Sequence, residues 1–203
     1  MANVLGPFGF SQWGTASGPV NFAENDNPPY RIAAGNTTAI FFGDLVRLTS
    51  ASATGYLVQW TAGDGGTGTN IPVGIFVGCR YFSTSQQKTI WNRYWPGSDA
   101  TGDVTAFVVD DPNAQFKVQA SAGPITQTSL GLTADIASTP TGNTTTGISG
   151  MSLGVPGTTT TFPFKIVNLI TTPPGANGTD LTTANNYVVV AFNNQTYKTL
   201  VAV

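Results

Sequence analysis

Residues 105–121, TAFVVDDPNAQFKVQAS, place two adjacent carboxylates, Asp110 and Asp111, between two apolar runs. Alternate residues are apolar in 104–108 and again in 116–120, which is the pattern of a strand with one buried face. Asp111 is followed by proline, and this pair favours a type I turn because Asp caps the next amides and the Pro ring fixes φ. We therefore predict a β-hairpin, and we interpret the two carboxylates as turn residues rather than as a catalytic or metal-binding pair.

Apolar segments recur along the rest of the chain at intervals of about ten residues, with Gly, Pro, Asn and Asp between them. These segments are 39–49, 55–61, 71–82, 88–95, 162–170 and 186–192, and we expect two further hairpins in 123–136 and 186–203. No stretch has helical periodicity beyond a turn or two. The sequence therefore predicts an all-β fold, a small β-barrel or sandwich, over residues 36–203, with a loop-rich stretch at 138–160.

Residues 1–35 differ from the rest, because glycine and proline interrupt them every few positions. Aromatic side chains are nevertheless spread through them: Phe8, Phe10, Trp13, Phe22 and Tyr30. A disordered tail would usually be poor in aromatics. We interpret this segment as an extended N-terminal arm, which either lies on an apolar partner surface or folds back on its own domain.

Only 9% of the residues are charged, against about 25% in typical soluble proteins, and the net charge is −2. The eight basic residues are scattered singly, so no cluster is present that could neutralise phosphates. The first ten residues lack the pattern of a signal peptide, and no apolar run approaches the ~18 residues of a membrane span. We expect neither nucleic acid nor membrane as a partner, and synthesis in a host cytoplasm.

Candidate catalytic residues are few. The chain has no histidine, which removes the commonest general base and metal ligand. Cys79, the single cysteine, lies in an apolar segment and is interpreted as a buried side chain. Ser152 stands in a G-x-S-x-G pattern, but the helix and histidine of a nucleophile elbow are missing. We therefore expect no enzyme, no catalytic or metal site and no cofactor, and leave open only a structural Ca²⁺ at Asp64 or at Asp110–Asp111.

The segment IWNRYW, residues 90–95, has the residue types of binding hot spots. Strand alternation would place Trp91, Arg93 and Trp95 on one face, with Asn92 and Tyr94 on the other. We predict that the first three contact a partner; the alternative is a strand that covers the core with its tryptophans.

Three pieces of the chain, AGNTTAIFFGDLVRL, IPVGIFVGCRYF and VTAFVVDDPNAQFKVQ, resemble head decoration (cement) proteins of tailed bacteriophages, which have a β-tulip core. The resemblance covers about residues 30–120 and is carried by Ala34, Gly35, Gly43, Asp44, Val46, Gly55, Pro72, Val73 and Gly74. It implies a non-enzymatic virion protein on the capsid exterior that binds the major capsid protein and bridges its subunits. It also implies a homo-oligomer, a dimer or trimer at a capsid symmetry axis.

Two other functions stay open at this point. A glycan- or receptor-binding module of a tail fibre or adhesin could stack sugars on Trp91, Tyr94 and Trp95. A hydrolase that uses carboxylates alone would need two convergent acids, which sequence spacing cannot reveal.

Overall fold

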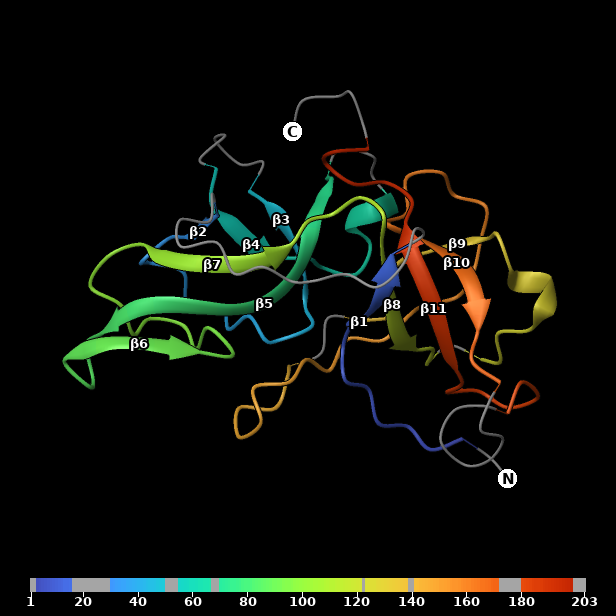
Figure 1. Ribbon diagram of the computed structural model, residues 1–203, viewed down its shortest axis with the longest axis horizontal. Helices are drawn as coiled ribbons and strands as arrows, with labels where there is room; N and C mark the ends of the chain where they lie inside the picture. The colour runs from blue at the N-terminus through green and yellow to red at the C-terminus, as the bar shows by residue number, and fades with distance from the viewer. Residues whose placement is uncertain are drawn as a thin grey trace.

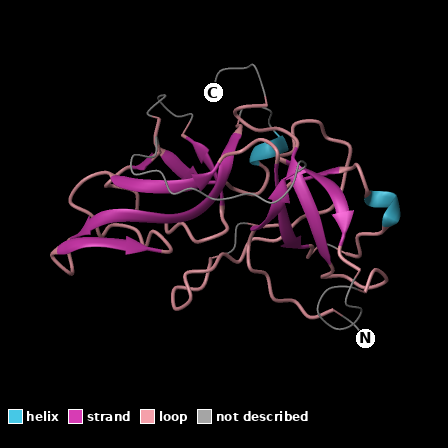
Figure 2. Ribbon diagram, in the orientation of Figure 1, coloured by secondary structure: helices cyan, strands magenta, loops and turns pink. Residues whose placement is uncertain are grey.

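A computed structural model describes residues 3–15, 30–49, 55–66, 70–121, 123–138, 141–171 and 180–198. Two antiparallel sheets make up this part of the chain (Figures 1 and 2). The first, sheet A, has the order β1 (Ser11–Thr15), β8 (Ala114–Gln119), β11 (Tyr187–Phe192), β10 (Phe164–Leu169) and β9 (Thr133–Ala134). The second, sheet B, has the order β2 (Arg31–Ile32), β7 (Val104–Val109), β5 (Pro72–Ser83), β3 (Leu45–Leu48) and β4 (Leu57–Gln59), with β6 (Lys88–Asn92) also paired to β5.

The all-β prediction is confirmed, and the two antiparallel sheets are consistent with a sandwich rather than a closed barrel. The only helical elements in the described residues are two short 3-10 turns, η1 (Asp64–Gly66) and η2 (Gln127–Ser129). Residues 123–136, expected to be a hairpin, contain η2 and the two-residue strand β9 instead. For the C-terminal hairpin, β11 forms as expected, but residues 199–203 lie outside the described residues.

The turn at Asp111 is confirmed, but the hairpin around it is wrong. Asp111 Oδ1 accepts the amide of Asn113 at 2.8 Å, and the Asp111 carbonyl accepts the amide of Ala114 at 3.0 Å. Strand β7 nevertheless pairs with β2 and β5, while β8 pairs with β1 and β11. Alternation and turn chemistry identify strands but not their partners, so the sequence could not show that this turn carries the chain between sheets.

Strand β5 is the longest element, and it links the two halves of the molecule. Its first part pairs with β3 and its last part with β6, while β7 runs along its other edge. Its pairing with β7 shifts between Phe76 and Gly78, which leaves Val77 as an extra residue of a β-bulge. Figure 1 shows the β5–β6 hairpin projecting from one end of the molecule.

Each sheet contributes to a hydrophobic core of its own. In the first core, aromatic rings from distant segments stack, such as Phe10 on Phe164 with ring centroids 4.3 Å apart. The second core lies on one face of sheet B and includes Cys79 and Trp95. Strand β5 contributes side chains to both cores, because Ile75 belongs to the first and Phe76 to the second.

The described part of the predicted arm lies on its own domain. The side chain of Asn3 donates to the carbonyls of Asp180 and Ala184 at 2.8 and 3.0 Å. Strand β1 then pairs with β8 at the edge of sheet A. Residues 3–15 therefore take the second of the two placements left open by the sequence, and they belong to the domain that was expected to begin at residue 36.

Residues that carry the resemblance to decoration proteins have architectural roles here. Gly43 has φ +91°, in the left-handed region that favours glycine. At Gly74, a Cβ atom would lie 2.2 Å from the carbonyl oxygen of Val109. Asp44 is fully buried, and its Oδ2 accepts the amide of Phe41 at 2.8 Å and the side-chain amide of Gln59 at 2.7 Å.

Candidate interaction surface

The β5–β6 hairpin presents aromatic side chains on the face of sheet B opposite its core. The register pairs Arg80 with Trp91 and Phe82 with Thr89, so these four side chains share one face. Tyr81, between Arg80 and Phe82, points the other way and is buried. On the outer face, Trp91 is 56% exposed and Phe82 43% exposed. We call Arg80, Phe82 and Trp91 the hairpin patch.

Trp91 is held in place although it is exposed. Its ring stacks on that of Phe107 in β7, with centroids 5.3 Å apart and planes 6° from parallel. The guanidinium carbon of Arg80 lies 5.1 Å from the Trp91 ring centroid, in the range of a cation–π contact. A side chain already fixed by its neighbours loses little entropy when a partner binds it.

The carboxylate of Asp99 stabilises the turn of the β5–β6 hairpin by accepting hydrogen bonds from it. Asp99 accepts the hydroxyls of Ser83 and Thr84 at 2.7 and 2.9 Å and the amide of Ser85 at 3.0 Å. These hydrogen bonds lower the pKa of Asp99 to about 2, the Ser83 hydroxyl having the largest effect. The carboxylate thus stays ionised, and able to accept these hydrogen bonds, at any pH above about 4.

The three residues predicted from IWNRYW do not share a face. Strand β6 ends at Asn92, so strand alternation does not extend to Trp95. Trp95 is fully buried in the core of sheet B, where it forms an isolated bridge with Ile40. Arg93 is exposed, and its guanidinium carbon lies 4.5 Å from the ring centroid of Phe42. Of the three, the structure brings only Trp91 to the hairpin patch.

The sugar-stacking set of Trp91, Tyr94 and Trp95 is not assembled either. Trp95 has no exposed surface, and Tyr94 stacks on Phe41 with centroids 5.2 Å apart. Trp91 is therefore the one member of this set with a large exposed surface.

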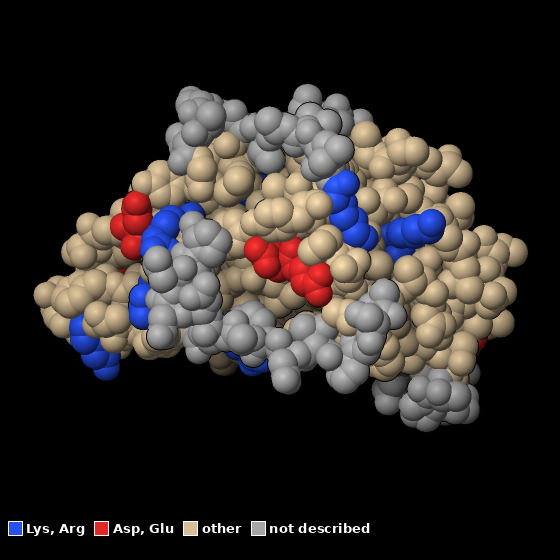
Figure 3. All heavy atoms as spheres, turned by 45° about the horizontal axis from the view of Figure 1, so that its top comes forward, with Lys and Arg blue, Asp and Glu red and all other residues tan. Residues whose placement is uncertain are grey.

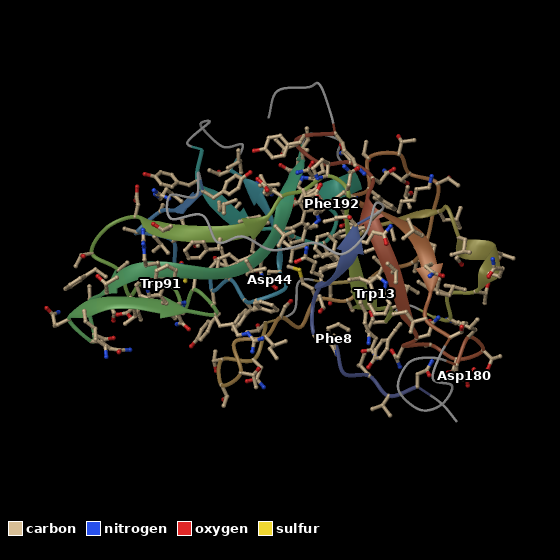
Figure 4. The ribbon with its side chains drawn as sticks, in the orientation of Figure 1. Phe8, Trp13, Asp44, Trp91, Asp180 and Phe192 are labelled. Carbon is tan, nitrogen blue, oxygen red and sulfur yellow. The ribbon has the colours of Figure 1, made fainter. Side chains whose placement is uncertain are left out.

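The aromatic residues of the N-terminal segment also separate into different environments. Phe10 and Tyr30 are buried in the two cores, so neither is accessible to a partner in this conformation. Phe8 packs edge-on against Tyr187, with centroids 5.6 Å apart. Trp13 is 55% exposed at a β-bulge of β1, distant from Trp91 (Figure 4). Phe22 lies outside the described residues.

Two members of the hairpin patch, Arg80 and Phe82, were missed by sequence reasoning. Both stand in the segment 71–82, which reads as a nearly continuous apolar run and so predicts a strand buried on both faces. The alternation that exposes them begins only after the bulge at Val77. Because a bulge leaves no clear local signal in the sequence, their exposure could not be derived from it.

Two hollows in the described surface were candidates for a site of acid–base catalysis, and neither offers a free acidic or basic side chain for it. In one of them, a groove of 580 Å³ formed by Pro7, Phe8 and the loop 141–150, the described lining residues include no ionisable side chain. A second, of 310 Å³, includes Asp135, whose carboxylate accepts the indole N–H of Trp60 at 2.8 Å and the amide of Gly63 at 3.0 Å. Both contacts give Asp135 a structural role.

The remaining candidate nucleophiles and metal ligands also have structural partners. Cys79 is buried, as predicted, and burial raises the pKa of its thiol to about 12. The Ser152 hydroxyl forms a hydrogen bond of 2.8 Å with that of Ser121. Asp64 forms an ion pair with Arg47 at 3.0 Å. Asp110 accepts the hydroxyl of Tyr30 at 2.8 Å.

No group of three or more acidic or cysteine side chains that could hold a metal ion occurs among the described residues. Nor does that part of the chain contain a helix long and apolar enough to cross a membrane. On the face in Figure 3, charged side chains are few and scattered among uncharged ones. Comparisons with protein-family models, with curated proteins and with solved structures found no match to this chain.

Proposed function

We propose that this protein is a non-enzymatic virion protein that decorates a bacteriophage capsid and binds it through the hairpin patch. The observation that carries the proposal is the exposure of Trp91 on a projecting hairpin, where Phe107 and Arg80 fix its ring. Trp and Arg are the residue types that dominate binding hot spots, and aromatic residues are enriched in interface cores. The resemblance of residues 30–120 to decoration proteins supplies the identity of the partner, the major capsid protein.

The low charge of the chain supports the same role. With 9% charged residues, recognition would rest on apolar area and backbone hydrogen bonds, which are short-ranged and insensitive to salt. Strand β6, whose described pairing is to β5 alone, offers backbone groups beside the aromatic rings. Weak contacts of this kind become strong when a dimer or trimer at a capsid symmetry axis repeats them.

Co-sedimentation with empty phage capsids, assembled from the cognate major capsid protein, tests the proposal. We expect saturable binding that changes little between 50 mM and 500 mM salt. Trp91→Ala should weaken binding at least tenfold, as expected of a hot-spot tryptophan. Val155→Ala is the matched control, because Val155 is also exposed but lies outside the hairpin patch. The proposal fails if the unmodified protein does not bind, or if both variants bind equally well.

Glycan binding is a second candidate, favoured by the exposed indole of Trp91. Parallel stacking on Phe107 and the cation–π contact of Arg80 already occupy part of this ring, so only its remaining surface is open to a sugar. A glycan array probed with the unmodified protein and with Trp91→Ala separates the two functions. Sugar binding that this substitution abolishes, together with unchanged capsid binding, would favour the adhesin over the decoration protein.

A further inference from the structure

An apolar cavity of 280 Å³ lies where the two sheets meet, and neither the hairpin patch nor the proposed function accounts for it. It is lined by Phe10, Gln12, Phe42, Ile75, Val77, Val109 and Phe116. Four of these, Phe10, Ile75, Val109 and Phe116, are buried core residues that form its floor. The other three are partly exposed, so the cavity is accessible from their side.

Two β-bulges border this cavity. The pairing of β1 with β8 shifts between Gln12 and Gly14, and that of β5 with β7 shifts between Phe76 and Gly78. A bulge bends its strand and redirects the side chains around it. Bulges are frequent beside functional sites, and here two from different sheets flank one cavity.

Gln12 is the one polar side chain among the described lining residues. It pairs with Phe116 across β1 and β8, so its side chain shares the core-facing side of sheet A. Its Nε2 atom is buried, and no acceptor in the described structure lies within hydrogen-bonding distance. A buried donor without an acceptor is costly, and native structures rarely leave one unexplained.

We infer that this cavity is a binding site for a small aromatic molecule with one hydrogen-bond acceptor, toward which the Gln12 side-chain amide rotates to donate, since its Nε2 atom is shielded from the cavity in this conformation. The volume suits such a molecule, since an apolar cavity of about 150 Å³ already holds benzene. The apolar floor would surround the ring, and the single amide would select for the acceptor. Ligands with a charge are disfavoured, because the described part of the lining contains no ionisable side chain.

Acetophenone and α-methylstyrene form a matched pair of probes, because they share a shape and differ in carrying a carbonyl oxygen or a methylene group. Titration of the full chain with each is followed by ¹H–¹⁵N NMR. We expect acetophenone to shift the side-chain NH₂ signals of Gln12 and the amides of Val77 and Phe42. Gln12→Met, which keeps the length of the side chain and removes the amide, should weaken acetophenone at least tenfold. It should change the affinity for α-methylstyrene less than threefold.

A second variant keeps the inference testable if Gln12→Met perturbs the fold. Val77→Phe fills the cavity from its partly exposed side and should reduce binding of both probes at least tenfold. The inference is overturned if acetophenone shifts none of the lining residues, if Gln12→Met weakens both probes equally, or if Val77→Phe leaves binding unchanged. None of these results depends on capsid binding by the hairpin patch.

Discussion

The two sheets use aromatic side chains in different ways. In sheet A, Phe10, Phe116, Phe164 and Phe192 are each at most 2% exposed and form one cluster, in which Phe164 stacks on Phe10 and Phe192 while Phe116 packs edge-on against Phe192. On the outer face of sheet B, Trp91 and Phe82 remain exposed at the end of a projecting hairpin. The aromatic rings of sheet A therefore stabilise the fold, whereas those of the hairpin patch are available to a partner. Substitutions in the two regions should separate stability from binding.

The largest effect on stability is expected at Phe10. Phe10→Ala removes a fully buried ring that stacks on Phe164, and a Phe→Ala change in a core costs about 3–5 kcal/mol. The free energy of unfolding, measured by urea denaturation, should fall by that amount. Trp13→Ala, three residues away at an exposed bulge, is the control and should cost less than about 1 kcal/mol. Equal losses would contradict the packing of residues 3–15 described here.

The second effect is a pH dependence caused by Asp44. Burial raises the pKa of its carboxyl from 3.8 to about 6, against the opposing effect of its hydrogen bonds. The folded protein thus binds this proton more tightly than the unfolded chain does. Its stability should fall by about 3 kcal/mol as the pH rises from about 4 to about 6, and this contribution should stay constant above that.

Asp44→Asn isolates this contribution. The amide still offers an acceptor to the Phe41 amide, but it does not titrate. Urea denaturation from pH 4 to pH 7 should show a smaller decline for the variant than for the unmodified protein. If the two curves stay parallel, Asp44 does not control the pH dependence.

A smaller effect is expected at Asp99, which fastens the turn of the β5–β6 hairpin. Asp99→Ala removes the acceptor of the Ser83 hydroxyl and the Ser85 amide at a partly exposed site. We expect a loss of about 1 kcal/mol in stability, together with a clear loss of capsid binding, because the hairpin patch is less well fixed. Unchanged capsid binding would mean that the turn does not position the patch.

The smallest effect on stability is expected at Trp91 itself. Trp91→Ala removes an exposed ring, and surface substitutions usually change the free energy of unfolding by less than about 1 kcal/mol. A loss as large as that of Phe10→Ala would place Trp91 among the structural aromatics and remove the contrast between the two regions.

Sequence patterns predict the strands of this protein better than their arrangement. The turn at Asp111 follows from its own side chain and the proline after it, and both act locally. The transfer of the chain from β7 in sheet B to β8 in sheet A depends on contacts with β5 and β11, which are distant in sequence. Local periodicity carries no information about such pairings.

Local patterns likewise predicted only part of the candidate site. The composition of IWNRYW correctly indicated Trp91 as an exposed aromatic residue. The same prediction was wrong for Trp95, because β6 ends at Asn92 and Trp95 is buried in the core. Phe82 is exposed and Arg80 partly exposed because the strands paired with the end of β5 do not cover its outer face.

The most direct test of the central claim is a cryo-electron-microscopy reconstruction of capsids decorated with this chain. The account predicts that the β5–β6 hairpin faces the shell, with Trp91 and Phe82 buried against the major capsid protein. A reconstruction in which the hairpin points into solvent while another face of the protein contacts the shell would contradict it.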